Sequence, residues 1–517
     1  MKTLLPLLLL SLLGITTLGC SPSTADGDPD SLSGEKAATI YCQGCHALPQ
    51  PQDLPRAVWA DHVLPLMGAM LGQYPADTGA YSRTELLGQG DERAARLQAQ
   101  TFPARAALPA ETWQAIQDYY LSQAPTQLPD SPHLTLGDDL RLFQAQPAAL
   151  ELAPPSTTLL HYGSDGTLYL GDANSQRLYV IDSAGQVQGA ARVREGAVHL
   201  HETPQALYLL VMGSFSPTDA APGFFMLLPK DGQEAPRVLI PNLQRPVHSQ
   251  LGDLNGDGLT DVLICEFGKW TGGLRAYLQR SDGSFQPQPL RERPGATRAY
   301  LDDWDQDGDL DAIALMAQGD EGVFYYQNDG QGQFTERNLL RFPPSYGSSY
   351  FALHDFNQDG LPDLLYLNGD NADYAPVPKP YHGLRLYLNR GDFDFELAQF
   401  LPLPGAYKAL PADFDQDGDV DLAAISFFPD YPRSAGRESF VFFENQGDFD
   451  FQARSFPQAD RGRWLTLTAG DPDQDGDLDL ALGSLTFEVP SDAARTQGWA
   501  QGGLPYLWLE NVGGRER

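Results

Sequence analysis

The sequence predicts a mainly β protein, a seven-bladed β-propeller preceded by a small all-α domain, and three observations support this fold class. A nine-residue pattern, with Asp or Asn at alternate positions and Gly at the sixth, occurs five times. The copies begin at Asp253, Asp303, Asp355, Asp413 and Asp471. Successive copies start 50, 52, 58 and 58 residues apart, so one supersecondary unit is repeated along the chain. The N-terminal region lacks this pattern and contains helical segments instead.

Each copy of the pattern runs directly into an apolar segment. The length and branched residues of these segments are typical of buried strands. The five segments are VLICEFG, AIALMAQ, LLYLNGD, LAAISFF and LALGSLT. A second strand, a Gly turn and a Phe-containing segment follow, so each unit contains four strands. Four-stranded units of about 40 to 60 residues indicate propeller blades.

The number of blades follows from the segments that lack the Asp-rich turn. Two plain units precede the first Asp-rich copy, and together with the five Asp-rich units they make seven. The last unit ends at YLWLENVGG without an outer strand, and LRLFQAQPAAL, at the start of the region, can supply it. Pairing the two chain ends in this way would close the ring and remove its open sheet edges.

Oxygen side chains at positions one, three, five and nine of each turn can converge on one hard cation, together with the backbone carbonyl at position seven. A set of oxygen ligands from carboxylates and a backbone carbonyl is typical of calcium sites. An EF-hand would require Glu at position twelve, where the chain has Ile264, Ala314, Tyr366, Ala424 and Leu482. The pattern therefore predicts calcium loops with about five Ca²⁺ ions. The predicted ligands are Asp253, Asn255, Asp257, Asp261, Asp303, Asp305, Asp307, Asp311, Asp355, Asn357, Asp359, Asp363, Asp413, Asp415, Asp417, Asp421, Asp471, Asp473, Asp475 and Asp479.

Four-stranded units whose turns carry DxDxDGxxD resemble the FG-GAP or VCBS repeats of β-propellers, a family that includes the integrin α head domains. The resemblance covers residues 140–515. It implies calcium-loaded loops and seven blades closed by strands from both ends of the chain.

Residues 1–20 contain Lys2, an apolar run from Leu4 to Ile15, and Cys20. This pattern is typical of an export signal. It resembles a bacterial lipoprotein signal, which implies lipidation of Cys20 and, because Ser21 follows, an outer-membrane location on the periplasmic or the cell-surface side. The alternative is an ordinary signal peptide with an incidental Cys. Residues 21–32 are expected to form a flexible tether.

Cys42, Cys45 and His46 form a CxxCH motif after a short helical segment. Two thiols at this spacing can bond to the vinyl groups of haem while the imidazole ligates the iron. A zinc half-site would need a second ligand pair, and a redox dithiol would need a βαβ context. The motif therefore predicts one covalent haem c. The remaining Cys265 lies in an apolar strand and is expected to be inert core packing.

A sixth iron ligand is expected from the stretch WADHVLPLMGAMLG, where Met67 is preferred over Met70 and then His62. A five-coordinate or water-ligated iron is the alternative. Residues 109–125 are expected to form a helix with an aromatic apolar side. Gly34, CxxCH, the methionine and this terminal helix resemble a class I c-type cytochrome over residues 33–125. The Pro-rich residues 126–139 are the expected linker.

Because propeller strands alternate in direction, the connections between second and third strands and those between blades should share the face opposite the Asp-rich turns. These loops are rich in aromatic and charged residues, which predicts a site at the channel mouth. The candidate catalytic residues are Glu321, Tyr346, Asp370, Asn371, Tyr381, His382, Lys408, Asp430, Arg463 and Trp464. Further candidates are Glu266, Lys269, Trp270, Asp320, Tyr374, Lys379 and Tyr407. For each residue alone, the alternative is an ordinary polar surface loop.

Three functions from different classes are compatible with these features. The first is lipid-anchored electron transfer through haem, with a propeller that recognises a redox partner protein or a small-molecule electron donor or acceptor. The second is a haem-dependent oxidoreductase whose substrate binds at the channel mouth, and the third is an adhesion or assembly module. Covalent haem disfavours the third, and the lack of a recognisable second cofactor places the second below the first. The net charge of −34 argues against nucleic acid as a partner, so membrane contact is expected through the lipid anchor only.

Overall fold

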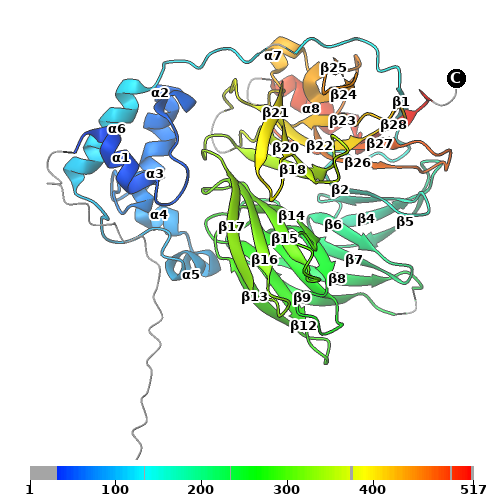
Figure 1. The fold of residues 1–517 in the computed structure, drawn as a ribbon, viewed down its shortest axis with the longest axis horizontal. Helices are drawn as coiled ribbons and strands as arrows, with labels where there is room; N and C mark the ends of the chain where they lie inside the picture. The colour runs from blue at the N-terminus through cyan, green and yellow to red at the C-terminus, as the bar shows by residue number, and fades with distance from the viewer. Residues whose placement is uncertain (1–31, 133, 233, 373–375, 490–491, 514–517) are drawn as a thin grey trace, which may run out of the picture.

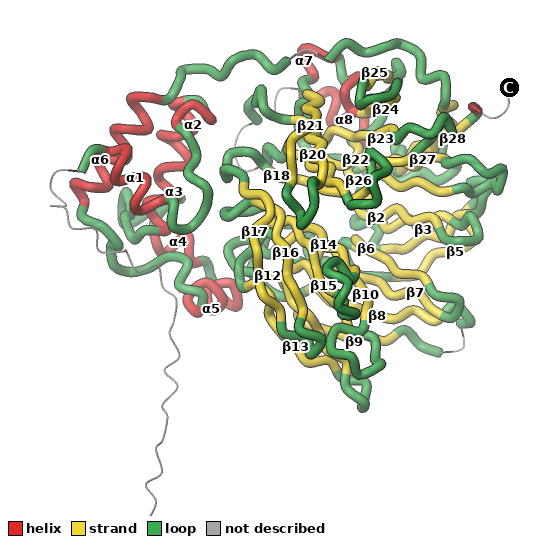
Figure 2. Tube along the Cα trace, in the orientation of Figure 1, coloured by secondary structure: helices red, strands yellow, loops and turns green. Residues whose placement is uncertain are grey.

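The computed structural model describes residues 32–132, 134–232, 234–372, 376–489 and 492–513. Helices α1 to α6 lie on one side of the molecule, and the strands form a separate circular body (Figures 1 and 2). The predicted export signal, Cys20 and nearly all of the predicted tether lie outside the described residues. Within the described ranges, no helix is long and apolar enough to cross a membrane.

The N-terminal body is helical, and both helices predicted there are present. Its elements are α1 (Gly34–Cys42), the 3₁₀ turn η2 (Pro51–Asp53), α2 (Arg56–Val58), the π-helical turn η3 (Trp59–Val63), α3 (Leu64–Met70), α4 (Arg83–Leu87), α5 (Gly90–Gln98) and α6 (Ala110–Gln123). The hydroxyl of Ser33 caps α1 by accepting the backbone N–H of Lys36 at 3.4 Å. Helices α4 and α5 were not predicted from the sequence.

Helices α1 and α6 cross in close contact at Gly34. A Cβ atom at this position would lie 2.1 Å from the carbonyl oxygen of Ala115 and 2.6 Å from the Cβ of Tyr119. Only glycine therefore permits this crossing. The core beneath it is apolar and includes Trp59 and Ile116, which are almost completely buried.

Seven four-stranded antiparallel sheets make up most of the remaining described chain. The first three blades contain β2 (Thr157–Tyr162), β3 (Leu168–Asp172), β4 (Arg177–Ile181) and β5 (Val187–Arg192); β6 (Ala197–Glu202), β7 (Ala206–Val211), β8 (Gly223–Pro229) and β9 (Arg237–Leu243); and β10 (Pro246–Gly252), β11 (Asp261–Glu266), β12 (Gly273–Gln279) and β13 (Phe285–Arg291). The first two blades lack the Asp-rich turn and the third contains the first copy, as predicted.

The four remaining blades carry the other Asp-rich turns. They contain β14 (Ala296–Asp302), β15 (Asp311–Met316), β16 (Gly322–Asn328) and β17 (Phe334–Arg341); β18 (Ser348–His354), β19 (Asp363–Asn368), β20 (Gly383–Asn389) and β21 (Phe395–Pro402); β22 (Ala406–Ala412), β23 (Asp421–Ser426), β24 (Phe440–Asn445) and β25 (Phe451–Arg454); and β26 (Trp464–Gly470), β27 (Asp479–Ser484), β28 (Tyr506–Asn511) and β1 (Phe143–Pro147). Two short helices, α7 (Tyr431–Ser434) and α8 (Ala493–Gly502), lie in connections of the last two blades.

The ring is closed by strands from both ends of the propeller, as the sequence predicts. Strand β1 pairs antiparallel with β28, with Phe143 opposite Asn511 and Ala145 opposite Leu509. Each first strand lies beside the first strands of both neighbouring blades, and the circle is completed between β26 and β2. No open sheet edge therefore separates the first blade from the last.

The second strands of the five Asp-rich blades, β11, β15, β19, β23 and β27, are buried along their whole length. Neighbouring blades cover both faces of these strands, which explains why their sequences are continuously apolar and do not alternate. Most residues of the outer strands are exposed or half-buried, for example in β17 and β21. The core of the propeller is therefore a series of layers between blades.

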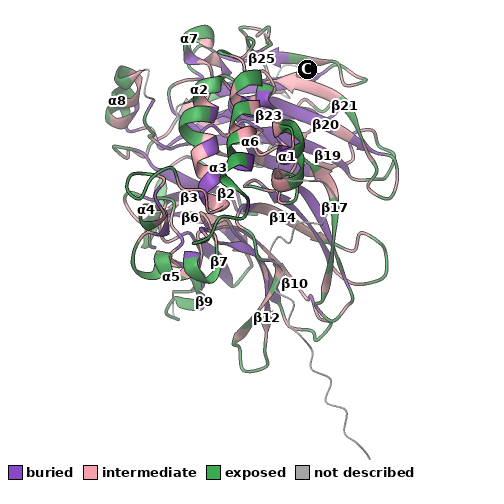
Figure 3. Cartoon of the chain, turned by 90° about the vertical axis from the view of Figure 1, so that its left-hand side faces the viewer, coloured by how far each residue is buried: buried purple, intermediate pink, exposed green. Residues whose placement is uncertain are grey.

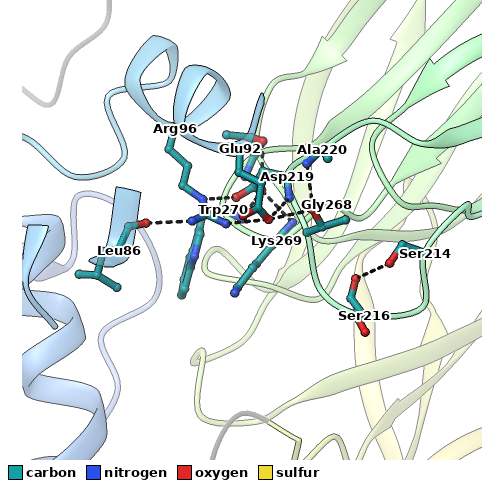
Figure 4. A network of polar contacts seen from close by, with 12 residues as sticks. Leu86, Glu92, Arg96, Ser214, Ser216, Asp219, Ala220, Gly268, Lys269 and Trp270 are labelled. Atoms are coloured by element: carbon teal, nitrogen blue, oxygen red, sulfur yellow. Dashed lines mark hydrogen bonds and ion pairs between the residues drawn. The ribbon is translucent and has the colours of Figure 1, made fainter. Parts of the chain in front are cut away.

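The helical body is fixed to the propeller through a buried ion pair (Figure 4). Arg96 of α5 donates from Nε to Oδ2 of Asp219 at 2.6 Å, and the Asp219 side chain is 0% exposed. The other carboxylate oxygen accepts the backbone N–H groups of Lys269, Trp270 and Thr271 at 3.2, 2.7 and 2.8 Å. One carboxylate thus joins α5 to the β7–β8 and β11–β12 loops.

Aromatic packing adds to this contact. The ring of Phe102 meets that of Trp270 edge to face, with centroids 5.6 Å apart. Figure 3 shows the helices in front of the propeller strands, so the helical body covers part of one propeller face. The chain then returns along the outside of the propeller to β1, and on the way Gly137 forms a parallel bridge to Arg454.

Replacing Phe143 by Ala tests the ring closure. The Phe143 side chain is 5% exposed and packs edge to face against Phe414 and Phe442. We expect the substitution to lower the free energy of unfolding by about 3–5 kcal/mol, because it leaves a cavity in the closing blade. Urea unfolding followed by intrinsic fluorescence measures this effect. Gln144→Ala, on the exposed side of the same strand, is the control, and an equal shift in both variants would contradict the prediction.

Replacing Arg96 by Met tests the attachment of the helical body. The change leaves the Asp219 carboxylate buried without its cation, at a cost of about 3–5 kcal/mol. We expect faster amide exchange in α5 and in the loops around Asp219 and Trp270, measured by hydrogen–deuterium exchange with mass spectrometry. Arg93→Met, at an exposed position of α5, is the control. Unchanged exchange in the two propeller loops of Arg96→Met would show that the ion pair does not hold the bodies together.

Candidate functional site

The CxxCH motif forms the C-terminal end of α1 and the turn after it. Neither thiol is in a disulfide and both are half-buried, and the backbone N–H of Cys45 donates to the carbonyl of Cys42 at 3.4 Å. The Nδ1 atom of His46 lies 2.8 Å from the carbonyl oxygen of Ala47. This contact favours the tautomer with the proton on Nδ1, which leaves Nε2 as the ring atom able to ligate a metal.

The surroundings of the motif favour the neutral forms of Cys42 and His46. Burial raises the pKa of the Cys42 thiol to about 11, and Cys45 adds to the effect. Burial also lowers the pKa of His46. A neutral imidazole is the form that binds a metal, so His46 needs no deprotonation to act as a ligand.

The three candidates for the sixth ligand lie in different places. Met67 packs against the same apolar cluster as Cys42. Met70 instead packs with Leu87 and Trp270 at the contact with the propeller. The side chain of His62 is exposed. Of the three, Met67 is therefore the one that shares a core with the motif.

The motif faces the propeller next to a group of charged side chains, here called the interface charge cluster. It consists of Asp320 with Arg291, Arg293 and Arg341. Arg293 donates to the carbonyl oxygen of Cys45 at 3.2 Å. Asp320 forms ion pairs with Arg291 and Arg341, each at 2.6 Å. The cluster acts on the charge of His46, since Asp320 raises its pKa while Arg341 and Arg293 lower it.

A second contact involves η2 and several of the predicted channel-mouth residues. The hydroxyl of Ser345 donates to Oδ2 of Asp53 at 3.0 Å, and the hydroxyl of Tyr381 donates to the Asp53 carbonyl at 2.8 Å. Tyr346 stacks on Tyr381 with centroids 4.9 Å apart, and Lys379 donates to the carbonyl of Ser345 at 3.0 Å. Burial raises the pKa of Asp53. These predicted site residues therefore lie at the contact between the two bodies.

Other predicted residues occupy structural positions. Trp464 is 0% exposed and its indole N–H donates to a backbone carbonyl. Arg463 donates to three backbone carbonyls. Glu321 is buried and accepts both the backbone N–H and the hydroxyl of Ser348. Asp430 caps α7. All four hold loops in place on the predicted face.

Other described candidates are Tyr407, Asp370, Asn371 and His382. Burial raises the pKa of Tyr407 to about 12, with Asp370 raising it and Arg245 lowering it. These three residues come from different blades, and the charges of Asp370 and Arg245 both act on the Tyr407 hydroxyl. Asn371 donates to a backbone carbonyl of its own loop. His382 is buried, and its Nε2 has no hydrogen-bond partner within the part of the chain that the structure describes. Tyr374 lies outside the described residues.

The Asp-rich turns share one backbone arrangement on the opposite face. In each turn the first Asp accepts the backbone N–H of the sixth-position Gly at 2.8 to 3.1 Å. The Gly residues at this position have φ between 83° and 100°, a region that favours glycine. In three turns, three carboxylate oxygens lie within 4.8 Å of one another. These groups are Asp303, Asp305 and Asp307; Asp413, Asp415 and Asp421; and Asp471, Asp473 and Asp475.

The ninth-position Asp has an additional role that the sequence pattern did not reveal. In every turn one of its oxygens accepts a backbone N–H at the end of the third strand, at 2.7 to 2.8 Å. These carboxylates are almost completely buried. Burial raises the pKa of Asp421 and of Asp479 to about 7. The ninth Asp thus joins the turn to the body of the blade.

Two of the turns are also connected to their neighbours. The Gln at position four has a positive φ, close to 60°, in four of the five turns. The amide of Gln358 donates to the carbonyl of Gly418 at 3.0 Å, and that of Gln416 donates to the carbonyl of Gly476 at 3.2 Å. Each bond links one Asp-rich turn to the next around the ring.

A group of mostly polar residues around the channel, one from each first strand, was missed by the sequence analysis. In each first strand the pairing register shifts before the third residue. The third residues, here called the channel ring, are Leu159, His199, His248, Arg298, Tyr350, Lys408 and Thr466. The predicted mouth residue Lys408 therefore lies within the channel. The sequence signal was the polar third position of AVHLHE, PVHSQLG and ATRAYLD.

Members of the channel ring touch across blades. The imidazoles of His199 and His248 have centroids 4.1 Å apart. The guanidinium of Arg298 lies 4.7 Å from the centroid of Tyr350, and Nζ of Lys408 lies 5.6 Å from the same centroid. These contacts join His199 to His248, and Arg298 and Lys408 to Tyr350, across the boundaries between blades. The first strands begin at the face that carries the helical body, so the group lies near that end of the channel.

Comparisons with known proteins agree with the repeats. The family described as "FG-GAP-like repeat" matches residues 253–314 and 303–366. Integrin alpha-V of Gallus gallus is 32% identical over 143 residues, which represents 22% of this chain and 14% of that protein. The chain therefore spans only a small part of this relative.

Similar solved structures include a catalytically inactive virginiamycin B lyase from Staphylococcus aureus with quinupristin. It is 11% identical with a TM-score of 0.45, and the match covers 72% of this chain and 99% of that chain. BBS1N in complex with ARL6DN is 10% identical with a TM-score of 0.42, covering 72% and 97%. At these scores neither structure carries an inference. The turns, the blade count and the sequence matches together show that this chain contains FG-GAP-like repeats within a seven-bladed β-propeller.

Proposed function

We propose that this protein is a c-type haem electron-transfer protein, in which Cys42, Cys45 and His46 hold the haem. Bound haem would supply one-electron oxidation and reduction at its iron. The propeller recognises the molecule that exchanges electrons with the haem domain. The observation that carries the proposal is the position of the motif against the propeller, where Arg293 donates to the Cys45 carbonyl.

The residues present fit a covalent haem. The two thiols are not joined in a disulfide and are available for thioether bonds. The contact between His46 and the Ala47 carbonyl orients the imidazole, as is usual for a metal ligand. Met67 is the proposed sixth ligand because it packs with Cys42, and a thioether ligand favours a higher potential than a second imidazole.

The helical body is attached to the propeller at several points. This attachment favours electron transfer within one molecule and disfavours a haem domain that moves freely. Three separate contacts join it to the propeller, through Asp219, Asp53 and Cys45. A molecule held at the loop face would therefore be at a fixed distance from the CxxCH motif. This arrangement also favours the second candidate function, a haem-dependent oxidoreductase whose substrate binds near Arg245, Asp370 and Tyr407.

Calcium is the proposed structural cation of the Asp-rich turns. Three groups of converging carboxylates support this proposal, and oxygen-only ligands suit a hard cation. A bound cation would offset the repulsion among these carboxylates and the cost of burying the ninth-position Asp. The export signal supports a location outside the cytoplasm, and lipidation of Cys20 at the outer membrane belongs to the same proposal.

Expression with a c-type haem maturation system tests the haem assignment. We expect a Soret band and a pyridine haemochrome spectrum that persist after denaturation, because thioether bonds are covalent. Cys42→Ser combined with Cys45→Ser should remove the covalent signal, while Cys265→Ser, at a buried thiol of β11, should retain it. A preparation without covalent haem would refute the proposal. Reduction of the bound haem by a panel of small-molecule donors then identifies the electron source.

The sixth ligand is tested with the same preparation. Met67→Ala should abolish the methionine–iron charge-transfer band of the oxidised protein, because no thioether then remains in the cluster around Cys42. Met70→Ala is the matched control and should keep the band. Loss of the band in the control alone would assign the role to Met70.

Removing calcium tests the turns. We expect chelation to lower the thermal unfolding midpoint, since a cation bound only by the folded state stabilises it by about 2.7 kcal/mol per site at a hundredfold excess over Kd. Asp415→Ala, at position three of its turn, should reduce the calcium-dependent part of the midpoint. Asp419→Ala, at position seven of the same turn, removes the same charge but no predicted side-chain ligand. Equal effects of both variants, or no effect of chelation, would contradict the assignment.

A further inference from the structure

The channel ring contains two basic side chains that have no carboxylate partner among the residues that the structure describes. Among the described residues, neither Arg298 nor Lys408 forms an ion pair with a carboxylate. Both side chains are half-buried on first strands, and neighbouring blades cover both faces of those strands. Their exposed parts therefore face the channel. Two like charges in so confined a space require a compensating anion or the loss of a proton.

The two cations also have unused hydrogen-bond donors. Arg298 donates from Nε to the Tyr300 hydroxyl at 2.9 Å, while no hydrogen bond of its Nη atoms is present among the described residues. The ammonium of Lys408 likewise has no such partner within the described chain and lies over the ring of Tyr350. Burial, reinforced by Arg298, lowers the pKa of Lys408 to about 7. An anion bound near Arg298 and Lys408 would raise the pKa of Lys408 again.

The neighbouring imidazole adds a further donor. His248 is 4% exposed, and its Nδ1 lies 3.4 Å from the backbone nitrogen of Ala299, which donates to it. In the neutral ring the proton is then on Nε2, and this buried atom has no hydrogen-bond partner among the described residues. His248 remains neutral because burial lowers its pKa well below the usual value. A buried N–H without a partner is costly, and a ligand that accepts its proton would remove that cost.

We propose that the channel ring binds a small oxyanion, held by the guanidinium of Arg298 and the ammonium of Lys408, with His248 as a neutral donor. The planar fork of Arg matches two oxygen atoms of such an anion, and Lys adds a point charge. The Asp370 carboxylate acts on the Tyr407 hydroxyl, together with Arg245. The proposal concerns the propeller alone and does not depend on the haem assignment.

The test is anion binding to the full-length, calcium-loaded protein, measured by isothermal titration calorimetry in a zwitterionic buffer. Phosphate and sulfate represent inorganic oxyanions, acetate represents the carboxylate of an organic ligand, and chloride is the non-oxyanion control. We expect saturable binding of one oxyanion per chain, and the preferred probe distinguishes an inorganic ligand from an organic one. Equal affinity for chloride, or no saturable binding of any probe, would overturn the proposal.

Variants connect the binding to the ring. Lys408→Met should weaken oxyanion binding at least about tenfold, because it removes a charge-assisted hydrogen bond at nearly constant volume. Lys36→Met removes the same charge from the exposed surface of α1 and should leave binding unchanged. Arg298→Lys keeps the charge and removes the fork, so it also should weaken binding and provides a second variant if Lys408→Met is unstable. Binding unaffected in a folded Lys408→Met or Arg298→Lys protein would overturn the assignment.

Discussion

The pairing of β1 with β28 is the interaction on which the rest of the structure depends. Each Asp-rich blade buries its second strand between two neighbours, so the layers of the core are complete only in a closed circle. An open array would expose the apolar faces of the first and last blades. Closure also creates the channel and fixes which loops share a face. The helical body contacts loops of four neighbouring blades. Its position therefore depends on closure, which brings these loops to the same face.

The two faces of the propeller have different chemistry. One face holds the Asp-rich turns, whose carboxylates are arranged for cations. The other face holds the longer loops, which bind the helical body through hydrogen bonds, an aromatic contact and the buried Arg96–Asp219 pair. The channel ring, with Arg298 and Lys408, lies toward this second end. The Asp-rich turns and the basic side chains of the channel ring therefore lie toward opposite ends of the propeller, with the Asp-rich turns away from the proposed redox centre.

A feature could be predicted from the sequence when the residues that cause it lie close together in the chain. The blades were predictable because Asp and Gly define the turns within nine residues, and the closure followed from one missing outer strand. The docking of α5 was not, since Arg96 and Asp219 are far apart in the sequence and neither belongs to a motif. Trp464 was assigned to the candidate site because it follows a loop, but its side chain is buried between blades. For Lys408, the register shift in β22 decides that it lies in the channel and not at its mouth.

The amide bonds between neighbouring Asp-rich turns have a mechanical consequence. Gln358 and Gln416 reach the following turn only because their backbones adopt a left-handed conformation, which costs about 1–2 kcal/mol for a residue other than glycine. Their acceptors are the carbonyls of Gly418 and Gly476, the residues that also contact the first Asp of each receiving turn. A displacement of one Asp-rich turn is therefore transmitted to the next one. The Asp-rich turns of the last three blades are thus mechanically coupled.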